Sequence, residues 1–269
     1  MRGAAAAKIN LALVVGPRRD DGKHELATVY QRVALADRLE VRVADHTDVS
    51  GFEGDTLVRA ALDRVAQETG TQLAARIDKR IPVAAGLGGG SADAATALRL
   101  GSRLLPTPLD DERLDELARQ LGADVPFFLR DGPQIGTGDG TALESVELPQ
   151  DYWVLLVLPN RATKTSTRAV YDSFDARSGE RGFEERRQAL LKAVARVRRP
   201  RDLAALPPND LASSPLADEL RTLGAFRADV SGAGPTVYGL FLHRAPAVAA
   251  RRRLRRIGRT WLTAPAWYV

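Results

Sequence analysis

Residues 82–92 read Pro82-Val83-Ala84-Ala85-Gly86-Leu87-Gly88-Gly89-Gly90-Ser91-Ala92. A strand pattern precedes this glycine-rich loop, and an alanine-rich helical pattern follows it, with Ser91 near the expected N-cap. Glycine lets a backbone approach phosphate oxygens without a Cβ clash, and free amides at a helix start attract anions. A flexible hinge is the alternative interpretation, but three consecutive glycines and a capping serine favour a phosphate-binding loop.

The glycine-rich loop differs from two common nucleotide-binding patterns. It lacks the closing Gly-Lys-Ser/Thr of a P-loop, and it is not the dinucleotide fingerprint Gly-x-Gly-x-x-Gly. Taken alone, the loop predicts that nucleotide phosphates bind here and leaves the reaction open.

The composition is that of a globular protein with one large or two modest domains. The chain has 269 residues, a hydrophobic fraction of 44% and no cysteine, so disulfides and thiolate metal sites are excluded. No apolar segment approaches the ~20 residues that cross a bilayer, and the N-terminal residues lack a signal-peptide pattern. We therefore expect a cytoplasmic protein with no membrane partner.

The net charge is +5, and much of the excess lies in residues 196–201 and 251–259. A basic balance favours anionic partners such as nucleotides, phosphates or nucleic acid. A solvated, arginine-rich helix face is the alternative. We prefer that alternative and expect no nucleic-acid partner.

The hydrophobic pattern predicts strands and helices in both halves of the chain. Strands are predicted at residues 8–15, 33–43, 74–81, 152–158, 236–242 and 264–269. Helices are predicted at residues 55–69, 91–100, 110–121, 183–197, 215–223 and 245–257. A tight glycine-rich turn is predicted at 135–140 and a domain boundary at 149–151. This alternation indicates an α+β or α/β protein.

Three segments, in this order along the chain, resemble the signature motifs of the GHMP kinases (galactokinase, homoserine, mevalonate and phosphomevalonate kinases). They are Ala7-Lys8-Ile9-Asn10-Leu11, the glycine-rich loop, and Val230-Ser231-Gly232-Ala233-Gly234-Pro235-Thr236. The resemblance covers nearly the whole chain. It implies a small-molecule kinase that binds ATP through residues 82–92 and uses Mg²⁺.

The resemblance also implies an α+β fold with the two-domain GHMP kinase architecture. Residues 1–149 are expected to form the ATP-binding domain, which is similar to domain 2 of ribosomal protein S5. Residues 150–269 are expected to form a ferredoxin-like domain. The active site is expected in the cleft between the two domains.

Further stretches narrow the resemblance to kinases of a cytidine-linked alcohol. Besides residues 7–11, they are Arg19-Asp20-Asp21-Gly22-Lys23-His24-Glu25-Leu26, Gly122-Ala123-Asp124-Val125-Pro126-Phe127-Phe128, Gly136-Thr137-Gly138-Asp139-Gly140 and Asn209-Asp210-Leu211. The implied substrate is a cytidine diphosphate bearing a branched tetrol. The implied reaction phosphorylates its 2-hydroxyl, in the non-mevalonate pathway to isoprenoid precursors.

Two residues are implied to be catalytic, Lys8 and Asp124. In the family pattern Gly-x-Asp-Val-Pro the aspartate lies beside the acceptor hydroxyl, and Asp124 follows the helix stop Gly122 on an expected loop. The resemblance places Lys8 beside it, where an ammonium favours the ionised carboxylate and stabilises charge on the transferred group. A turn aspartate and an exposed strand lysine are the alternatives. Because phosphoryl transfer is usually loose, Asp124 is expected to act as a base or to orient the hydroxyl.

The implied substrate-binding residues are Asn10, His24, Thr167, Tyr171, Gly232 and Gly234. Asn10 shares a strand face with Lys8, and His24 matches a histidine that hydrogen-bonds the cytosine. Thr167 and Tyr171 match residues that line the cytidine pocket, where Tyr171 would stack on the base. A surface-loop histidine and a buried core tyrosine are the alternatives for His24 and Tyr171.

One position departs from the family pattern Asp-Gly-Tyr-His, because Lys23 stands where a tyrosine would stack on the cytosine. A lysine can lie along a ring or make a cation–π contact, but it is not an aromatic wall. A kinase for another alcohol is therefore a second hypothesis. A nucleotide- or RNA-binding relative without turnover is a third, although a binding module would not need Lys8, Asp124 and the glycine-rich loop together.

The metal and the assembly are less constrained by the sequence. ATP chemistry implies Mg²⁺, and the candidate protein ligand is the hydroxyl of Ser91. No acidic ligand pair stands out, so phosphate oxygens and water are expected to fill most of the ion's shell. We expect a monomer or a homodimer.

Overall fold

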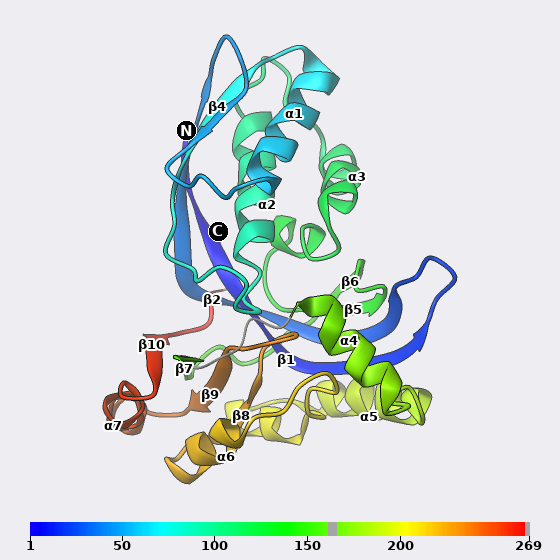
Figure 1. Cartoon of the computed structure of the whole chain (residues 1–269), viewed down its shortest axis with the longest axis vertical. Helices are drawn as coiled ribbons and strands as arrows, with labels where there is room; N and C mark the ends of the chain where they lie inside the picture. Colours follow the sequence, from blue (N-terminus) through cyan, green and yellow to red (C-terminus); the bar gives the residue numbers. More distant parts are fainter. Residues whose placement is uncertain (161–165, 267–269) are drawn as a thin grey trace.

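The computed structural model describes residues 1–160 and 166–266, which form two β-sheets with helices packed against them (Figure 1). The strands of the first sheet are β1 (Arg2–Arg18), β2 (His24–Val43), β3 (Asp48–Ser50), β4 (Leu73–Asp78), β5 (Gln134–Gly138) and β6 (Ala142–Ser145). Strands β1 and β2 form a long antiparallel hairpin. The second half of β2 also pairs with β4 and its first half with β5, so β2 joins both ends of the sheet.

Helices cover the β4 end of this sheet (Figure 1). They are α1 (Leu57–Thr69), α2 (Gly89–Ser102), α3 (Asp111–Leu121) and the short 3-10 helix η1 (Pro126–Leu129). Helix α1 ends at Gly70 in the left-handed conformation, at the residue that the sequence pattern predicts. Helix α2 is buried along most of its length, and its alanines let it pack closely against α1 and β1.

The second sheet contains β7 (Trp153–Pro159), β8 (Arg227–Val230), β9 (Val237–Phe241) and β10 (Gly258–Thr263). Their order across the sheet is β10-β7-β9-β8 and all pairs are antiparallel, which is the ferredoxin-like arrangement. The helices of this half are α4 (Thr167–Ala176), α5 (Phe183–Arg196), η2 (Pro200–Ala205), α6 (Pro215–Thr222) and α7 (Arg244–Leu254). The fold is therefore α+β, as expected.

One hydrophobic core joins the two sheets. It brings Ile9 and Leu11 of β1 together with Val154 of β7 and with Tyr238 and Leu240 of β9. All strands of the first sheet lie before residue 149 and those of the second lie after it. We keep the division into domains 1–149 and 150–269 as a proposal. Among the described residues, no helix is long and apolar enough to span a membrane.

Three local predictions are corrected. Helix α2 begins at Gly89, because Gly88 with its φ of +68° is the N-cap, so Ser91 lies in the first turn and is not the cap. Residues 134–138 form β5 instead of a turn, because β2 and β6 pair with them on both sides. The last described strand is β10 and not residues 264–269, of which 267–269 lie outside the described residues. Its pairing with β7, and not an apolar pattern of its own, makes β10 a strand.

Candidate active site

A cleft of about 840 Å³ lies between the glycine-rich loop, the β1–β2 hairpin and helix α4. It gathers residues that are far apart in the chain. The predicted site residues that line it are Lys8, Asn10, His24, Ala84, Gly86, Gly88, Ser91, Asp124, Thr167, Tyr171, Gly232 and Gly234. The structure thus brings every predicted catalytic and substrate-binding residue to one cavity.

Lys8 and Asp124 form an ion pair in this cleft. The Lys8 Nζ lies 3.6 Å from Asp124 Oδ2, and the lysine side chain is only 6% exposed, against 34% for the aspartate. The Lys8 backbone amide donates to the carbonyl of Leu87 at 2.9 Å, so β1 contacts the glycine-rich loop directly. The ammonium is therefore fixed between the loop and the carboxylate, while the carboxylate keeps access to the cleft.

Asn10 orients the lysine. Its Nδ2 donates to Thr28 Oγ1 at 2.8 Å, and the Thr28 hydroxyl in turn donates to the carbonyl of Ala12 at 2.7 Å. The amide oxygen is therefore the atom left to accept from Lys8 Nζ, at 2.7 Å. Two strands of the hairpin thus hold the ammonium through a chain of buried hydrogen bonds.

Tyr30 is a site residue that the sequence interpretation missed. Its hydroxyl donates to Asp124 Oδ1 at 3.3 Å, and Lys8 Nζ lies 5.6 Å from its ring centroid. Burial and the Asp124 charge raise the pKa of Tyr30 well above its usual value, so the hydroxyl keeps its proton as a donor. Tyr30 lies directly opposite Asn10 in the hairpin. This hairpin register was the only feature that could have assigned Tyr30 to the site. The predicted strand began at residue 33 and did not include Tyr30.

The glycine-rich loop contacts the turn at residues 231–234 through backbone atoms. The Ser231 hydroxyl donates to the carbonyl of Gly86 at 2.9 Å. A Cβ on Gly86, whose φ is +77°, would lie 2.2 Å from the carbonyl oxygen of Ser231. A Cβ on Gly232 would lie 3.4 Å from both Lys8 Nζ and Asn10 Oδ1. The 231–234 turn therefore closes the cleft beside Lys8.

Glycines also bring the start of α2 close to Lys8. A Cβ on Gly88 would meet the Phe128 ring at 2.9 Å and Lys8 Cγ at 3.0 Å. The side chains of Ala85, Leu87 and Ala92 are buried in the core. What the loop offers to a ligand is therefore mainly backbone, namely the amides of the first turn of α2, with the Ser91 side chain beside them.

A buried ionic cluster that the sequence did not reveal holds both ends of the glycine-rich loop. Lys79, just after β4, donates to Asp37 at 2.6 Å and to Asp93 of α2 at 2.5 Å. Asp37 also accepts from the backbone amide of Ile81 at 2.7 Å. Burial raises the pKa of Asp93 to about 7, against the opposing effect of Lys79. The cluster fixes the distance between β4 and α2, and with it the shape of the loop between them.

Two aromatic rings also line the cleft. The ring of His24 stacks on Tyr171 of α4 with centroids 4.7 Å apart and planes 29° apart. Its Nε2 lies 2.7 Å from Asp175 Oδ1, and because a carboxylate only accepts, this nitrogen carries a hydrogen. Burial raises the pKa of Tyr171 to about 12. Thr167 lies exposed at the first turn of the same helix.

Lys23 lies over no aromatic ring of residues 1–160 and 166–266. Its Nζ pairs with Asp139 Oδ2 at 2.5 Å, between the β1–β2 hairpin tip and the β5–β6 turn. Although burial opposes it, the hydrogen bonds from Lys23 and Thr141 lower the pKa of Asp139 to about 2. The position of the expected aromatic wall is thus occupied by a charged pair at the mouth of the cleft.

The described residues contain no group of three or more histidine, cysteine, aspartate or glutamate side chains placed to hold a metal ion. The cleft nevertheless holds the Ser91 hydroxyl beside the glycine-rich loop. A hard cation here would take its remaining ligands from phosphate oxygens and water.

Family models for both halves match this chain. The GHMP kinases N terminal domain matches residues 56–132, and the GHMP kinases C terminal domain matches residues 204–260. The chain belongs to the GHMP kinase family and has its two-domain architecture, with a first domain like domain 2 of ribosomal protein S5 and a ferredoxin-like second domain. It is accordingly a small-molecule kinase.

Two similar proteins within the family carry the same name. The 4-diphosphocytidyl-2-C-methyl-D-erythritol kinase of Pelobacter propionicus is 38% identical, over 97% of this chain and 96% of its own. The enzyme of the same name from Geobacter sulfurreducens is 36% identical over the same shares. A crystal structure of 4-(cytidine 5'-diphospho)-2C-methyl-D-erythritol kinase matches 99% of both chains with a TM-score of 0.80 and 32% identity. A mevalonate kinase matches with a TM-score of 0.76 at 12% identity, which shows the fold alone.

Proposed function

We propose that this kinase transfers the γ-phosphoryl group of ATP to the 2-hydroxyl of 4-diphosphocytidyl-2-C-methyl-D-erythritol, in the non-mevalonate pathway to isoprenoid precursors. The observation that carries the proposal is the arrangement of the cleft. The Lys8–Asp124 ion pair beside the glycine-rich loop and the stacked rings of His24 and Tyr171 line the same cleft. An acceptor that carries both an alcohol and a base has a polar pair and an aromatic pair to contact here, and the names of the relatives reported above agree with it.

Asp124 is the group that receives the acceptor hydroxyl in this proposal. Tyr30 donates to one carboxylate oxygen, and Lys8 lies beside the other. Both contacts hold the carboxylate in place, where it can accept a hydrogen bond from the hydroxyl and aim its oxygen at the phosphoryl group. Lys8 also supplies positive charge where the phosphoryl group passes, and loose transfer depends mainly on such positioning and charge stabilisation.

The nucleotide phosphates are assigned to the glycine-rich loop and the start of α2. The backbone geometry fits them, because glycines stand where a Cβ would clash and the first amides of α2 have no partner within the helix. When bound, Mg²⁺ would neutralise charge on the phosphate oxygens, and Ser91 is the residue that would hold it. Gly232 and Gly234 would approach the acceptor from the opposite side.

The cytosine is assigned to His24 and Tyr171, with Thr167 beside them. Tyr171 offers a stacking face, and His24 offers a polar ring edge whose orientation Asp175 fixes. Because Lys23 is paired with Asp139, the base would stack on one side only. We expect this acceptor to bind more weakly than it would to a site with two aromatic walls.

The direct test is the release of ADP from ATP and Mg²⁺ with a panel of acceptors: the cytidylyl-tetrol, free methylerythritol phosphate, mevalonate, homoserine and galactose. We expect turnover with the cytidylyl-tetrol alone. The Asp124→Asn variant should lose at least about 10²-fold in turnover, the lower end for general-base catalysis. Activity only on another alcohol would overturn the substrate, and near-normal turnover of Asp124→Asn would overturn the role of this residue. Cytoplasmic location and a monomeric or homodimeric state stay predictions.

A further inference from the structure

Asn209 lies at the junction between β1 and the 231–234 turn. Its backbone forms a parallel bridge with Leu13 of β1, and the next amide, of Asp210, donates to the Leu13 carbonyl at 2.9 Å. The carboxylate of Asp210 accepts from the amide of Val15 at 2.9 Å. Residues 209–211 therefore attach to the strand that carries Lys8.

The Asn209 side chain forms hydrogen bonds to the turn on the other side of this junction. Its Nδ2 donates to the carbonyls of Val230 at 2.9 Å and Gly232 at 2.7 Å, and its Oδ1 accepts from the amide of Leu211 at 2.8 Å. The residue is only 8% exposed, so a broken bond would leave a buried polar atom without a partner. Gly232 is the turn residue that lies beside Lys8.

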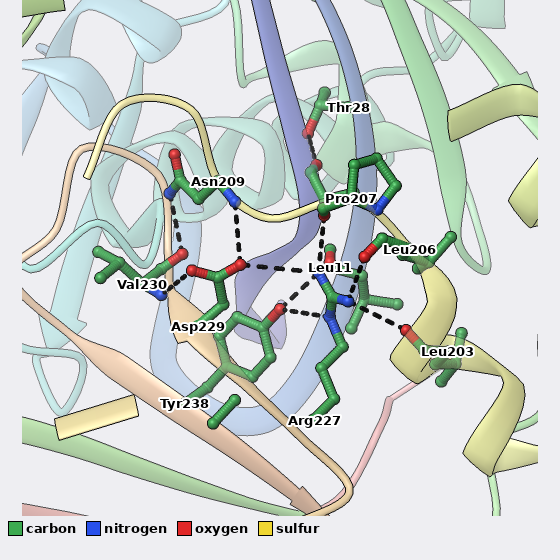
Figure 2. A network of polar contacts seen from close by, with 12 residues as sticks. Leu11, Thr28, Leu203, Leu206, Pro207, Asn209, Arg227, Asp229, Val230 and Tyr238 are labelled. Carbon is green, nitrogen blue, oxygen red and sulfur yellow. Dashed lines mark hydrogen bonds and ion pairs between the residues drawn. The ribbon is translucent and has the colours of Figure 1, made fainter. Parts of the chain in front are cut away.

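A second layer of buried polar groups holds Asn209 itself (Figure 2). Asp229 accepts from the backbone amide of Asn209 at 2.9 Å and lies 3.6 Å from the guanidinium of Arg227. The same guanidinium donates to three backbone carbonyls and to the hydroxyl of Tyr238. The three carbonyls belong to Leu203, Leu206 and Pro207. The Tyr238 hydroxyl donates onward to the carbonyl of Leu11 at 3.2 Å, so the network returns to β1.

The 231–234 turn offers backbone amides that could contact an anion. Among residues 1–160 and 166–266, no atom accepts a hydrogen bond from the backbone amides of Gly232 and Ala233. Gly232 has a φ of +58°, and successive amides around a left-handed residue form anion-binding concavities. Both residues line the cleft. By bonding the Gly232 carbonyl, Asn209 fixes the peptide plane that carries the amide of Ala233, and by bonding the Val230 carbonyl it fixes the plane that leads into Ser231.

We propose that Asn209 is a positioning residue for phosphoryl transfer: it holds the 231–234 turn, by its Gly232 carbonyl, at a fixed place opposite Lys8. This inference rests on the proposed kinase function. Asn209 touches neither substrate in the proposal, and the residues assigned to cytosine lie on other segments. Its loss is therefore expected to change the transfer step and to leave cytidine recognition intact.

The test compares Asn209→Ala and Asn209→Ser with Tyr238→Phe. The tyrosine variant is a matched control, because it removes two buried hydrogen bonds from the same network and leaves those of Asn209 in place. For each, kcat and both KM values are measured by ADP release per folded molecule, with unfolding followed by circular dichroism. We expect Asn209→Ala to lose about 10- to 100-fold in kcat, as misplacements of about 1 Å do. The KM for the acceptor should stay within about threefold.

The two Asn209 variants are expected to form a series, because serine can restore one donor, so Asn209→Ser should fall between wild type and Asn209→Ala. If Asn209→Ala does not fold, the kcat of Asn209→Ser is compared with that of Tyr238→Phe to test the proposal. Normal kcat in a folded Asn209 variant, or an equal loss of kcat in Tyr238→Phe, would overturn the proposal. If the wild type itself transfers phosphate to no acceptor in the panel, the proposed function fails instead.

Discussion

Gly86→Ala probes how closely the glycine-rich loop approaches the 231–234 turn. The new Cβ would lie 2.2 Å from the Ser231 carbonyl oxygen, whereas real Cβ contacts stay above 3.0 Å. The two backbones must therefore separate by at least 0.8 Å, the difference between these distances. The left-handed φ of +77° at Gly86 adds strain for any residue with a Cβ, of about 1–3 kcal/mol.

The matched control is Gly70→Ala. Gly70 has almost the same φ, +71°, but nothing lies within 4 Å of its Cβ position. Both variants carry the conformational strain, and only Gly86→Ala carries the steric clash. The difference between them therefore measures the clash alone.

Both variants are compared by chemical unfolding and by ADP release. We expect Gly70→Ala to lose about 1 kcal/mol of stability, the low end for such strain, and to keep wild-type kcat. Gly86→Ala should lose more stability, and its kcat should fall by roughly 10- to 100-fold, because the loop and the turn move apart by nearly the 1 Å that costs about 10²-fold. A folded Gly86→Ala protein with normal turnover would refute the reasoning.

Three further predictions concern Tyr30 and Lys23 in the cleft and Asp93 in the buried ionic cluster. Tyr30→Phe removes the donor to Asp124 and should lower kcat by about 3- to 10-fold, the worth of about one hydrogen bond, with the KM for ATP unchanged in steady-state kinetics; a larger change in KM than in kcat would contradict this. Lys23→Tyr supplies the missing stacking face and should lower the KM for the cytidylyl-tetrol by about fivefold, the low end of base–aromatic stacking; a raised KM would argue against base binding there. The folded pKa of Asp93 is raised to about 7 from about 4 in an unfolded chain, so its contribution to stability is present below pH 4 and is lost as the pH rises through 7. The free energy of unfolding should therefore fall more steeply between pH 4 and 7 in wild type than in Asp93→Asn, and equal slopes in denaturant titrations over this range would show that the folded pKa of Asp93 is not raised.

Local patterns predicted those parts of the fold that local forces determine. The end of α1 at Gly70 follows from one left-handed residue after an apolar stripe. The glycine-rich loop, Lys8 and Asp124 were identified from contiguous motifs, and the structure brings them together. In each case the signal and the structural feature lie within a few residues of one another.

Features that depend on distant partners escaped the sequence analysis. Strand β8 begins with Arg227 and contains Asp229, charges that suggest an exposed segment, yet the strand is buried because these side chains pair with groups up to 24 residues away. Lys79 likewise reads as a surface lysine until Asp37 and Asp93 are brought to it from β2 and α2. Tyr30 could be placed in the site only once the register of the β1–β2 hairpin was known. A buried charge is recognisable only when its partner is known.

The construction of the cleft separates two tasks. The residues proposed for phosphoryl transfer are held by strands of both sheets, through Lys8 on β1 and the turn that follows β8. Those proposed for the base of the acceptor belong to peripheral pieces: the hairpin tip with Lys23, the β5–β6 turn with Asp139, and α4 with Tyr171. Exchanging those three pieces would alter the alcohol that is accepted without disturbing the register that aligns donor and hydroxyl. In a family of this construction, new specificities can arise at the rim while the chemistry at the centre is inherited unchanged.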